Sequence, residues 1–340
     1  MVFRPPIWLR NSHLQSILPA LRWRNPLVAR RAGALLAVSR PLVLDCGEGV
    51  RLLGHLSQPG IEVSAAGASD AIEVGRAGEA RPLVILLHGW EGSSESAYVL
   101  SLGAHLFAHG YDIFRLNLRD HGGTHAMNPG IFHSCRLAEI VGAVHRLQTL
   151  FPDRRLQIGG FSLGGNFALR VAARAPAQGI ALERAFAICP LLRPHATMRV
   201  LDRRGSIYRQ HFLTKWKSSL RLKQRAFPEL YDFKRILGMN TLTAMTEDLV
   251  LQHSEFPSLD AYLSGYAIVD DVLANLQVPS HILSALDDPI IPAGDLAALA
   301  PSANLSIVTH ALGGHCGFLD RTYGASWADR YVEKVLSARY

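Results

Sequence analysis

The chain has 340 residues, of which 49% are hydrophobic and 19% charged, an ordinary globular composition with ample material for a core. Its net charge of +7 is concentrated in residues 1–40, with seven arginines and no acid, and in residues 193–235, with twelve Lys/Arg and three acids. No recognisable nucleic-acid-binding module accompanies these blocks, so we expect no nucleic-acid partner. The basic blocks are expected to be solvated or to associate weakly with anionic membrane surfaces.

The cysteines and the hydropathy pattern predict a cytoplasmic protein. The four cysteines are scattered without a CxxC pair, which is typical of a reducing compartment and not of a disulfide framework or a zinc site. No uninterrupted apolar run reaches the roughly 18 residues of a membrane-spanning helix. Polar residues and prolines also interrupt the apolar region that a signal peptide would need near the N-terminus.

Apolar runs bounded by glycine or proline alternate with helical patterns along the chain. We predict two strands around a Gly-Glu-Gly turn within 41–59, and further strands at 82–89, 111–118, 155–161, 184–190, 280–286 and 305–312. We predict helices at 96–108, 134–150, 164–175 and 325–338, with a helical stretch near 293–300. This alternation predicts an α/β fold, with a mainly parallel, doubly wound sheet covered by helices on both faces.

Two segments depart from the alternation. Residues 61–81 are rich in Ala, Gly, Ser and Glu and are predicted to form a surface loop. Residues 193–276 lack a convincing buried strand and are predicted to form a helical cap over the edge of the sheet where such folds bind ligands. The core would then consist of residues 41–192 and 277–340, with residues 1–40 as a basic segment that packs on it.

The run Gly160-Phe161-Ser162-Leu163-Gly164 matches G-x-S-x-G between a predicted strand and a predicted helix. In a sharp strand-to-helix turn, only small residues fit two places either side of the serine, and the turn lifts its hydroxyl above the sheet. We therefore interpret Ser162 as a nucleophile. The alternative is that Ser162 only caps the helix.

A serine nucleophile needs a base and a residue that orients the base. Asp287 and Asp288 follow one later strand, and His315 lies among glycines after the next one. The order serine, acid, histidine is the one this architecture requires. We predict His315 as the general base and Asp287 as the acid, because it leaves the strand first, with Asp288 as the alternative acid.

The oxyanion of the reaction needs backbone N–H donors. We predict that Leu163, directly after the nucleophile, supplies one and that Trp90 supplies the other. His88 and Gly89 would shape the loop that carries Trp90. His121, His125 and His133 also cluster in sequence, but glycines and a proline between them remove the helical spacing of a metal site, and we expect no metal ion or organic cofactor.

The combination of motifs resembles the YheT-like branch of the α/β-hydrolase superfamily. The segments that carry the resemblance are FRPPIWLRNSHLQSILP, LLHGWEGSSES, NLRDHGGTHAMNPGIFHS, GGFSLGGN, ALDDPIIP and GGHCGF. The resemblance covers nearly the whole chain except the 61–81 loop and much of the cap. It implies a serine hydrolase that acts on carboxylic esters, but it does not supply a physiological substrate.

We therefore expect a serine esterase that uses an acyl-enzyme and takes a small-molecule ester, with an oligomeric state that the sequence does not determine. The alternatives are an acyltransferase on the same scaffold and, from another class, a binding protein with a vestigial site. Some large apolar side chains of the cap are expected to form an acyl pocket, whereas most would form the cap's own core: Phe212, Trp216, Phe227, Leu230, Tyr231 and Phe233.

Overall fold

The computed structural model describes residues 2–20, 25–60 and 81–338. These residues contain one eight-stranded sheet in the order β1-β2-β4-β3-β5-β6-β7-β8. Its strands are β1 (Arg40–Asp45), β2 (Arg51–Ser57), β3 (Leu83–Leu87), β4 (Asp112–Leu116), β5 (Leu156–Phe161), β6 (Leu182–Ile188), β7 (Ser280–Ala285) and β8 (Leu305–His310). The predicted strands are confirmed to within a few residues at their ends.

The sheet is mainly parallel, as predicted. Only β2 runs antiparallel to its neighbours β1 and β4, and every other neighbouring pair is parallel. All five residues of β3 are buried, which explains why its apolar residues are continuous rather than alternating. Because β3 and β5 are parallel neighbours, the loops that follow them meet at one edge of the sheet.

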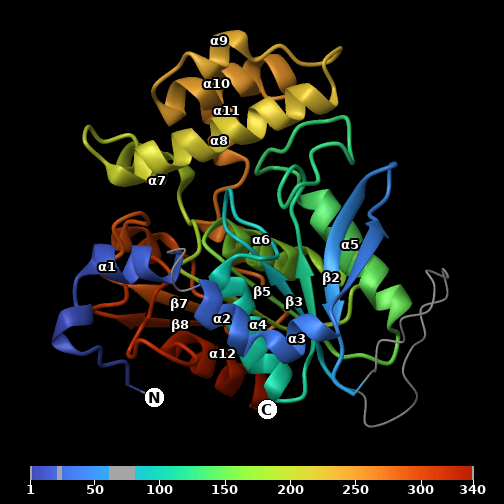
Figure 1. Cartoon of the computed structure of the whole chain (residues 1–340), viewed down its shortest axis with the longest axis vertical. Coiled ribbons are helices and arrows are strands. Elements are labelled where there is room, and N and C mark those ends of the chain that lie inside the picture. Colours follow the sequence, from blue (N-terminus) through green and yellow to red (C-terminus); the bar gives the residue numbers. More distant parts are fainter. Residues whose placement is uncertain (1, 21–24, 61–80, 339–340) are drawn as a thin grey trace.

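Helices cover both faces of the sheet (Figure 1). The helices α5 (Leu137–Leu150) and α6 (Leu163–Arg174) bury their apolar sides in one core. The helices α4 (Ala97–Ala108) and α12 (Trp327–Ser337) contribute to the core on the opposite face. The helical stretch predicted near 293–300 is a 3-10 helix, Ala293–Ala298.

The chain between β6 and β7 forms a helical cap, which lies beyond one end of the sheet in Figure 1. Its helices are α7 (Pro194–Leu201), α8 (Ile207–Ala226), α9 (Lys234–Leu237), α10 (Leu242–His253) and α11 (Leu259–Ser264). The cap has an apolar cluster of its own, in which Trp216 of α8 and Met245 of α10 are buried. A helical cap on an α/β core is thus the architecture of this chain.

The described part of the N-terminal segment contains the α-helices α1 (Ser12–Ile17), α2 (Asn25–Arg31) and α3 (Gly33–Ala37). Gln15 of α1 is fully buried, and α2 lies against α4. Apart from its last residue, the loop predicted at 61–81 lies outside the described residues. None of the helices within the described ranges is long and apolar enough to cross a membrane.

Candidate active site

Ser162 occupies the tight turn between β5 and α6. Its backbone lies at φ 54° and ψ −118°, a conformation that L-residues rarely adopt. The Ser162 N–H donates to the carbonyl of Ile188 at 2.9 Å, which fixes the turn against the neighbouring strand. Ser162 is the N-cap residue of α6, but its hydroxyl makes no capping hydrogen bond to the helix, so capping does not account for the hydroxyl.

The two glycines of the motif are required by close backbone contacts. A Cβ atom at Gly160 would lie 2.6 Å from the backbone of Gly164. A Cβ atom at Gly164 would lie 2.4 Å from the carbonyl oxygen of His88. Any larger residue at either position would therefore push the serine turn away from the loop that follows β3.

The histidine predicted as the base contacts Asp288 and not Asp287. His315 Nδ1 lies 2.8 Å from Asp288 Oδ2, and Asp288 Oδ1 accepts from the N–H groups of Ile290 and Ile291. The expected contact of Asp287 with His315 is therefore wrong, and the other candidate acid, Asp288, lies against the imidazole. The physical reason is the turn after β7, which carries the chain one residue further before a carboxylate faces the histidine.

Asp287 contacts the backbone of the same loop. Its Oδ1 accepts from the N–H of Gly314 at 2.9 Å, and its Oδ2 is buried without a partner among the described residues. Burial raises the pKa of Asp287, and the Gly314 N–H opposes that shift. Asp287 thus supports the position of the histidine loop.

Both the side chain and the backbone of His315 make hydrogen bonds. Its N–H donates to Ser16 Oγ of α1 at 2.7 Å. Burial lowers the pKa of His315, but the neighbouring Asp288 carboxylate and the Cys316 side chain raise it, and the pKa lies well above its usual value. An Asp288 contact at Nδ1 leaves Nε2 as the nitrogen that can exchange a proton with a serine.

The two N–H groups predicted for the oxyanion hole have no acceptor within the part of the chain that the structure describes. Leu163 begins α6, where the first N–H groups of a helix have no partner inside the helix. Trp90 lies in the turn after β3. Both residues line the same pocket as Ser162.

Two buried histidines shape the Trp90 loop. His88 Nδ1 donates to the Gly89 carbonyl at 2.7 Å, and its Nε2 accepts from the N–H of Leu118. Burial lowers the pKa of His88 to about 4, which keeps the ring neutral. His121 Nε2 accepts in turn from the N–H of Glu91 at 3.1 Å.

The role of His121 is absent from the sequence-based prediction, because its partner Glu91 is distant in sequence. His121 Nδ1 donates to the Arg119 carbonyl, whereas His125 Nε2 contacts Ser219 Oγ of the cap. The rings of His121 and His125 thus contact different parts of the structure.

A pocket of about 590 Å³ connects these groups. Ser162, His315 and Trp90 line it from the core, and Phe212 and Trp216 line it from the cap. The Trp90 ring stacks on Phe212 with centroids 5.1 Å apart and an interplanar angle of 13°. The other large apolar side chains considered for an acyl pocket do not line it: Phe227, Leu230, Tyr231 and Phe233.

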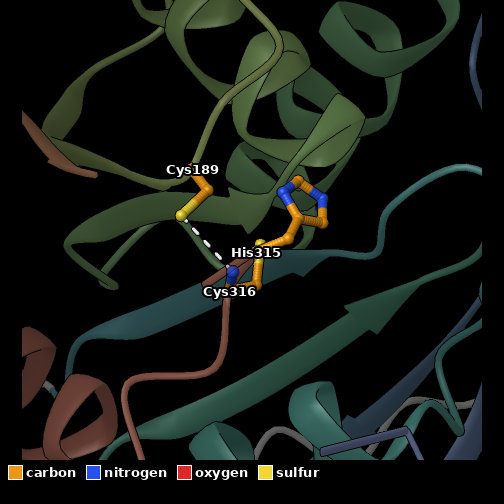
Figure 2. Close-up of side chains that lie close together, drawn as sticks. All are labelled: Cys189, His315 and Cys316. Atoms are coloured by element: carbon orange, nitrogen blue, oxygen red, sulfur yellow. Dashed lines mark hydrogen bonds between the residues drawn. The ribbon is translucent and has the colours of Figure 1, made fainter. Parts of the chain in front are cut away.

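A second set of reactive side chains lies at the same edge of the sheet as Ser162. One side-chain donor atom each from Cys189, His315 and Cys316 lies within 4.8 Å of the others. Figure 2 shows Cys189 on the segment after β6 and the other two residues on the loop after β8. A hydrogen bond from the Cys316 N–H to the Cys189 sulfur connects the two segments. No sequence pattern predicts this group, because its two cysteines are far apart in the chain.

Comparisons with known proteins agree with this architecture. A family model described as the alpha/beta hydrolase fold matches residues 82–322. The chain is similar to phospholipase ABHD3 of Mus musculus, with 23% identity over 269 residues that cover 76% of this chain and 64% of the relative. It is also similar to YheT of Escherichia coli, an esterase by name, with 23% identity over 252 residues that cover 71% of this chain and 72% of the relative.

Among solved structures, the chain resembles the esterase Pf2001 of Pyrococcus furiosus. The TM-score is 0.53 at 13% sequence identity, and the match covers 89% of this chain and 92% of the other. At this identity the likeness shows the fold alone. The chain spans less than two thirds of the length of the mammalian phospholipase it matches.

Proposed function

Because the chain belongs to the alpha/beta hydrolase fold family, we propose that it is a serine hydrolase that cleaves carboxylic esters through Ser162, His315 and Asp288. The observation that carries the proposal is the 2.8 Å contact between His315 Nδ1 and Asp288 Oδ2 beside a pocket that Ser162 also lines. A strained serine at a strand-to-helix turn, an oriented imidazole and free N–H groups are the parts that acyl transfer needs.

In the proposed reaction His315 Nε2 takes the proton of the Ser162 hydroxyl as its oxygen attacks the ester carbonyl. Asp288 accepts a hydrogen bond from Nδ1, so it holds the tautomer and stabilises the imidazolium that forms. The imidazolium then returns the proton to the leaving alcohol, which departs and leaves an acyl-serine.

The N–H groups of Leu163 and Trp90 would donate to the oxyanion of the tetrahedral intermediate. Such donors cost no reorganisation during the reaction, and losing one lowers the rate by roughly 10²–10³. Water activated by His315 then hydrolyses the acyl-serine. None of these steps requires a metal ion or an organic cofactor.

The pocket supports an ester with an apolar acyl group. Two aromatic side chains, Phe212 and Trp216, line its cap side together with two apolar side chains, Met198 and Leu249. A volume of about 590 Å³ lies within the roughly 300–1,000 Å³ of small-molecule sites.

The cytoplasmic location and the weak association with anionic membranes stay predictions.

The test is hydrolysis of p-nitrophenyl esters of increasing acyl length by the wild-type chain, Ser162→Ala and Ser134→Ala. Ser134 lines the same pocket and is the matched control. We expect Ser162→Ala to lose about 10⁴-fold or more in kcat, and to lose labelling by a fluorophosphonate, whereas Ser134→Ala keeps both. Activity that survives in Ser162→Ala would reject the mechanism.

A second assay separates the hydrolase from the acyltransferase. The same ester is turned over with and without an added acceptor alcohol, and the products are identified. A hydrolase releases mainly free acid in both cases. Acyl transfer to the acceptor as the main product would instead favour the acyltransferase, and failure of both reactions together with absent fluorophosphonate labelling would favour a binding protein.

A further inference from the structure

We propose that Cys189, His315 and Cys316 form a binding site for a thiophilic divalent cation such as Zn²⁺, and that occupation of this site switches the enzyme off. The binding site stands on the geometry of the three side chains alone. Only the inhibition rests on the proposed function, because it assumes that His315 is the base.

The donor atoms fit such an ion in type and spacing. Two cysteine sulfurs and one imidazole nitrogen are ligands that Zn²⁺ takes in proteins, at about 2.3 Å for sulfur and 2.0–2.1 Å for nitrogen. A tetrahedron with these bonds places its ligands roughly 3.4–3.8 Å apart. Donor atoms that already lie within 4.8 Å of one another reach that spacing with shifts of about 1 Å.

The surrounding backbone holds the two sulfurs in place. The N–H of Cys316 donates to Cys189 Sγ at 3.3 Å, and this bond persists when the sulfur is a thiolate. The thiols themselves donate to backbone carbonyls, Cys189 to Gly314 at 3.6 Å and Cys316 to Ile188 at 3.4 Å. An ion that replaces both thiol protons therefore releases only two weak S–H bonds.

The histidine has the support that metal-binding histidines have elsewhere. A ligating imidazole usually donates its other N–H to a carboxylate, which fixes the ring. His315 has such a partner in Asp288. The same pair that suits a general base also suits a metal ligand.

The ion can reach the site through the substrate pocket. His315 and Cys316 both line that pocket, whereas Cys189 is buried behind them. With three protein ligands, a fourth position remains for water. The site is thus open on the side from which a substrate would enter.

Metal binding removes the base whichever ring nitrogen the ion takes. Binding at Nε2 occupies the nitrogen that takes the serine proton. Binding at Nδ1 breaks the bond to Asp288 and leaves the ring unoriented. In both cases the ion competes with ester hydrolysis, so it acts as an inhibitor and not as a cofactor.

The first test measures binding without using activity. The reduced 340-residue chain, in a phosphine reductant, is titrated with Co²⁺, whose thiolate complexes give charge-transfer absorption. We expect that absorption for the wild-type chain and for Ser162→Ala. It should be lost in Cys189→Ser and Cys316→Ser and kept in Cys135→Ser, a free cysteine away from the group.

Circular dichroism shows whether each variant is folded, and Cys189→Ala replaces Cys189→Ser if that variant is not. Absence of thiolate-to-cobalt absorption in the wild-type chain overturns the proposal, as does its persistence in both folded Cys189 and Cys316 variants. Because Ser162→Ala is included, this test is independent of whether the chain hydrolyses esters.

The second test measures inhibition by buffered Zn²⁺ in the same reductant, with each variant normalised to its own zinc-free rate. We expect the half-inhibitory zinc concentration of Cys189→Ser to rise at least about tenfold above that of Cys135→Ser. Equal inhibition of the two variants would place the inhibitory ion elsewhere and overturn the switch. Absence of any inhibition by zinc in the wild-type chain would overturn it as well.

Discussion

Gln15 and Leu319, 304 positions apart in the chain, are joined by paired hydrogen bonds. Gln15 Nε2 donates to the Leu319 carbonyl at 2.9 Å, and Gln15 Oε1 accepts from the Leu319 N–H at 2.7 Å. The same Nε2 also donates to the Leu9 carbonyl at 2.7 Å. Since His315 donates to Ser16 in the same helix, α1 is a support for the histidine loop.

Replacing Gln15 by alanine is therefore expected to lower both stability and activity. The change leaves the buried N–H and carbonyl of Leu319 without partners, at a cost of about 2–4 kcal/mol in the free energy of unfolding. Urea unfolding and ester hydrolysis measure the two effects. The control is Leu14→Ala, an exposed position on the same helix; an equal loss in both variants would contradict the support by Gln15.

Asparagine substitutions separate the two neighbouring acids. Asp288→Asn is expected to lower kcat by about 10³–10⁴, because an amide cannot hold the imidazole in the required tautomer or stabilise its charge. Asp287→Asn keeps an oxygen that can accept from Gly314 N–H, so its loss should stay below about tenfold. The measurement is kcat for one activated ester at a fixed pH. The reverse order of effects would restore Asp287 as the acid.

Much of this arrangement follows from local sequence patterns. The continuous apolar residues of β3 predict a buried parallel strand, and the glycines around Ser162 predict the tight turn, because both depend on neighbouring residues. The acid was harder to assign, since Asp287 and Asp288 are adjacent and only the path of the turn decides which one faces His315.

Other parts of the site depend on contacts between distant segments. Three contacts join segments that are distant in the chain: the bond of His121 to Glu91, the bond of Cys316 to Cys189 and the bonds of Gln15 to Leu319. No periodicity or spacing in a single sequence encodes such contacts. They become visible only when the order of the strands brings the loops together.

The buried His88 makes stability depend on pH. Its pKa is lowered to about 4 by burial, compared with about 6.5 in an unfolded chain. Between these values the unfolded state binds more protons, so the stabilising contribution is fully present above pH 6.5 and is lost as the pH falls towards 4. From pH 7 to pH 5 this single group should remove roughly 2 kcal/mol from the free energy of unfolding.

The test is urea unfolding of the wild-type chain and His88→Gln at pH 7 and pH 5. The variant lacks the titrating group. Its free energy of unfolding should therefore be lower than that of the wild-type chain at pH 7, and should fall less than the wild-type value between pH 7 and pH 5. Wild-type and variant curves with the same dependence on pH would show that His88 does not titrate as its burial requires.

The cap is joined to the core by a buried ion pair. Lys223 Nζ of α8 lies 2.8 Å from Asp120 Oδ1 and also donates to the carbonyls of Asn128 and Gly130. Burial raises the pKa of Asp120 and lowers the pKa of Lys223, and each partner opposes the shift of the other. Both shifts favour the neutral forms, because desolvation of the two charges is costly. Removing one partner would leave the other charge buried without its counter-ion.

Lys223→Met is expected to lower the free energy of unfolding by about 3–5 kcal/mol, because it leaves the Asp120 carboxylate buried alone. Adding Asp120→Asn removes that charge, so the double variant should be more stable than Lys223→Met itself. Arg221→Met, at an exposed position of the same helix, is the control. If the second substitution recovers nothing, the loss comes from packing of the cap and not from the unpaired carboxylate.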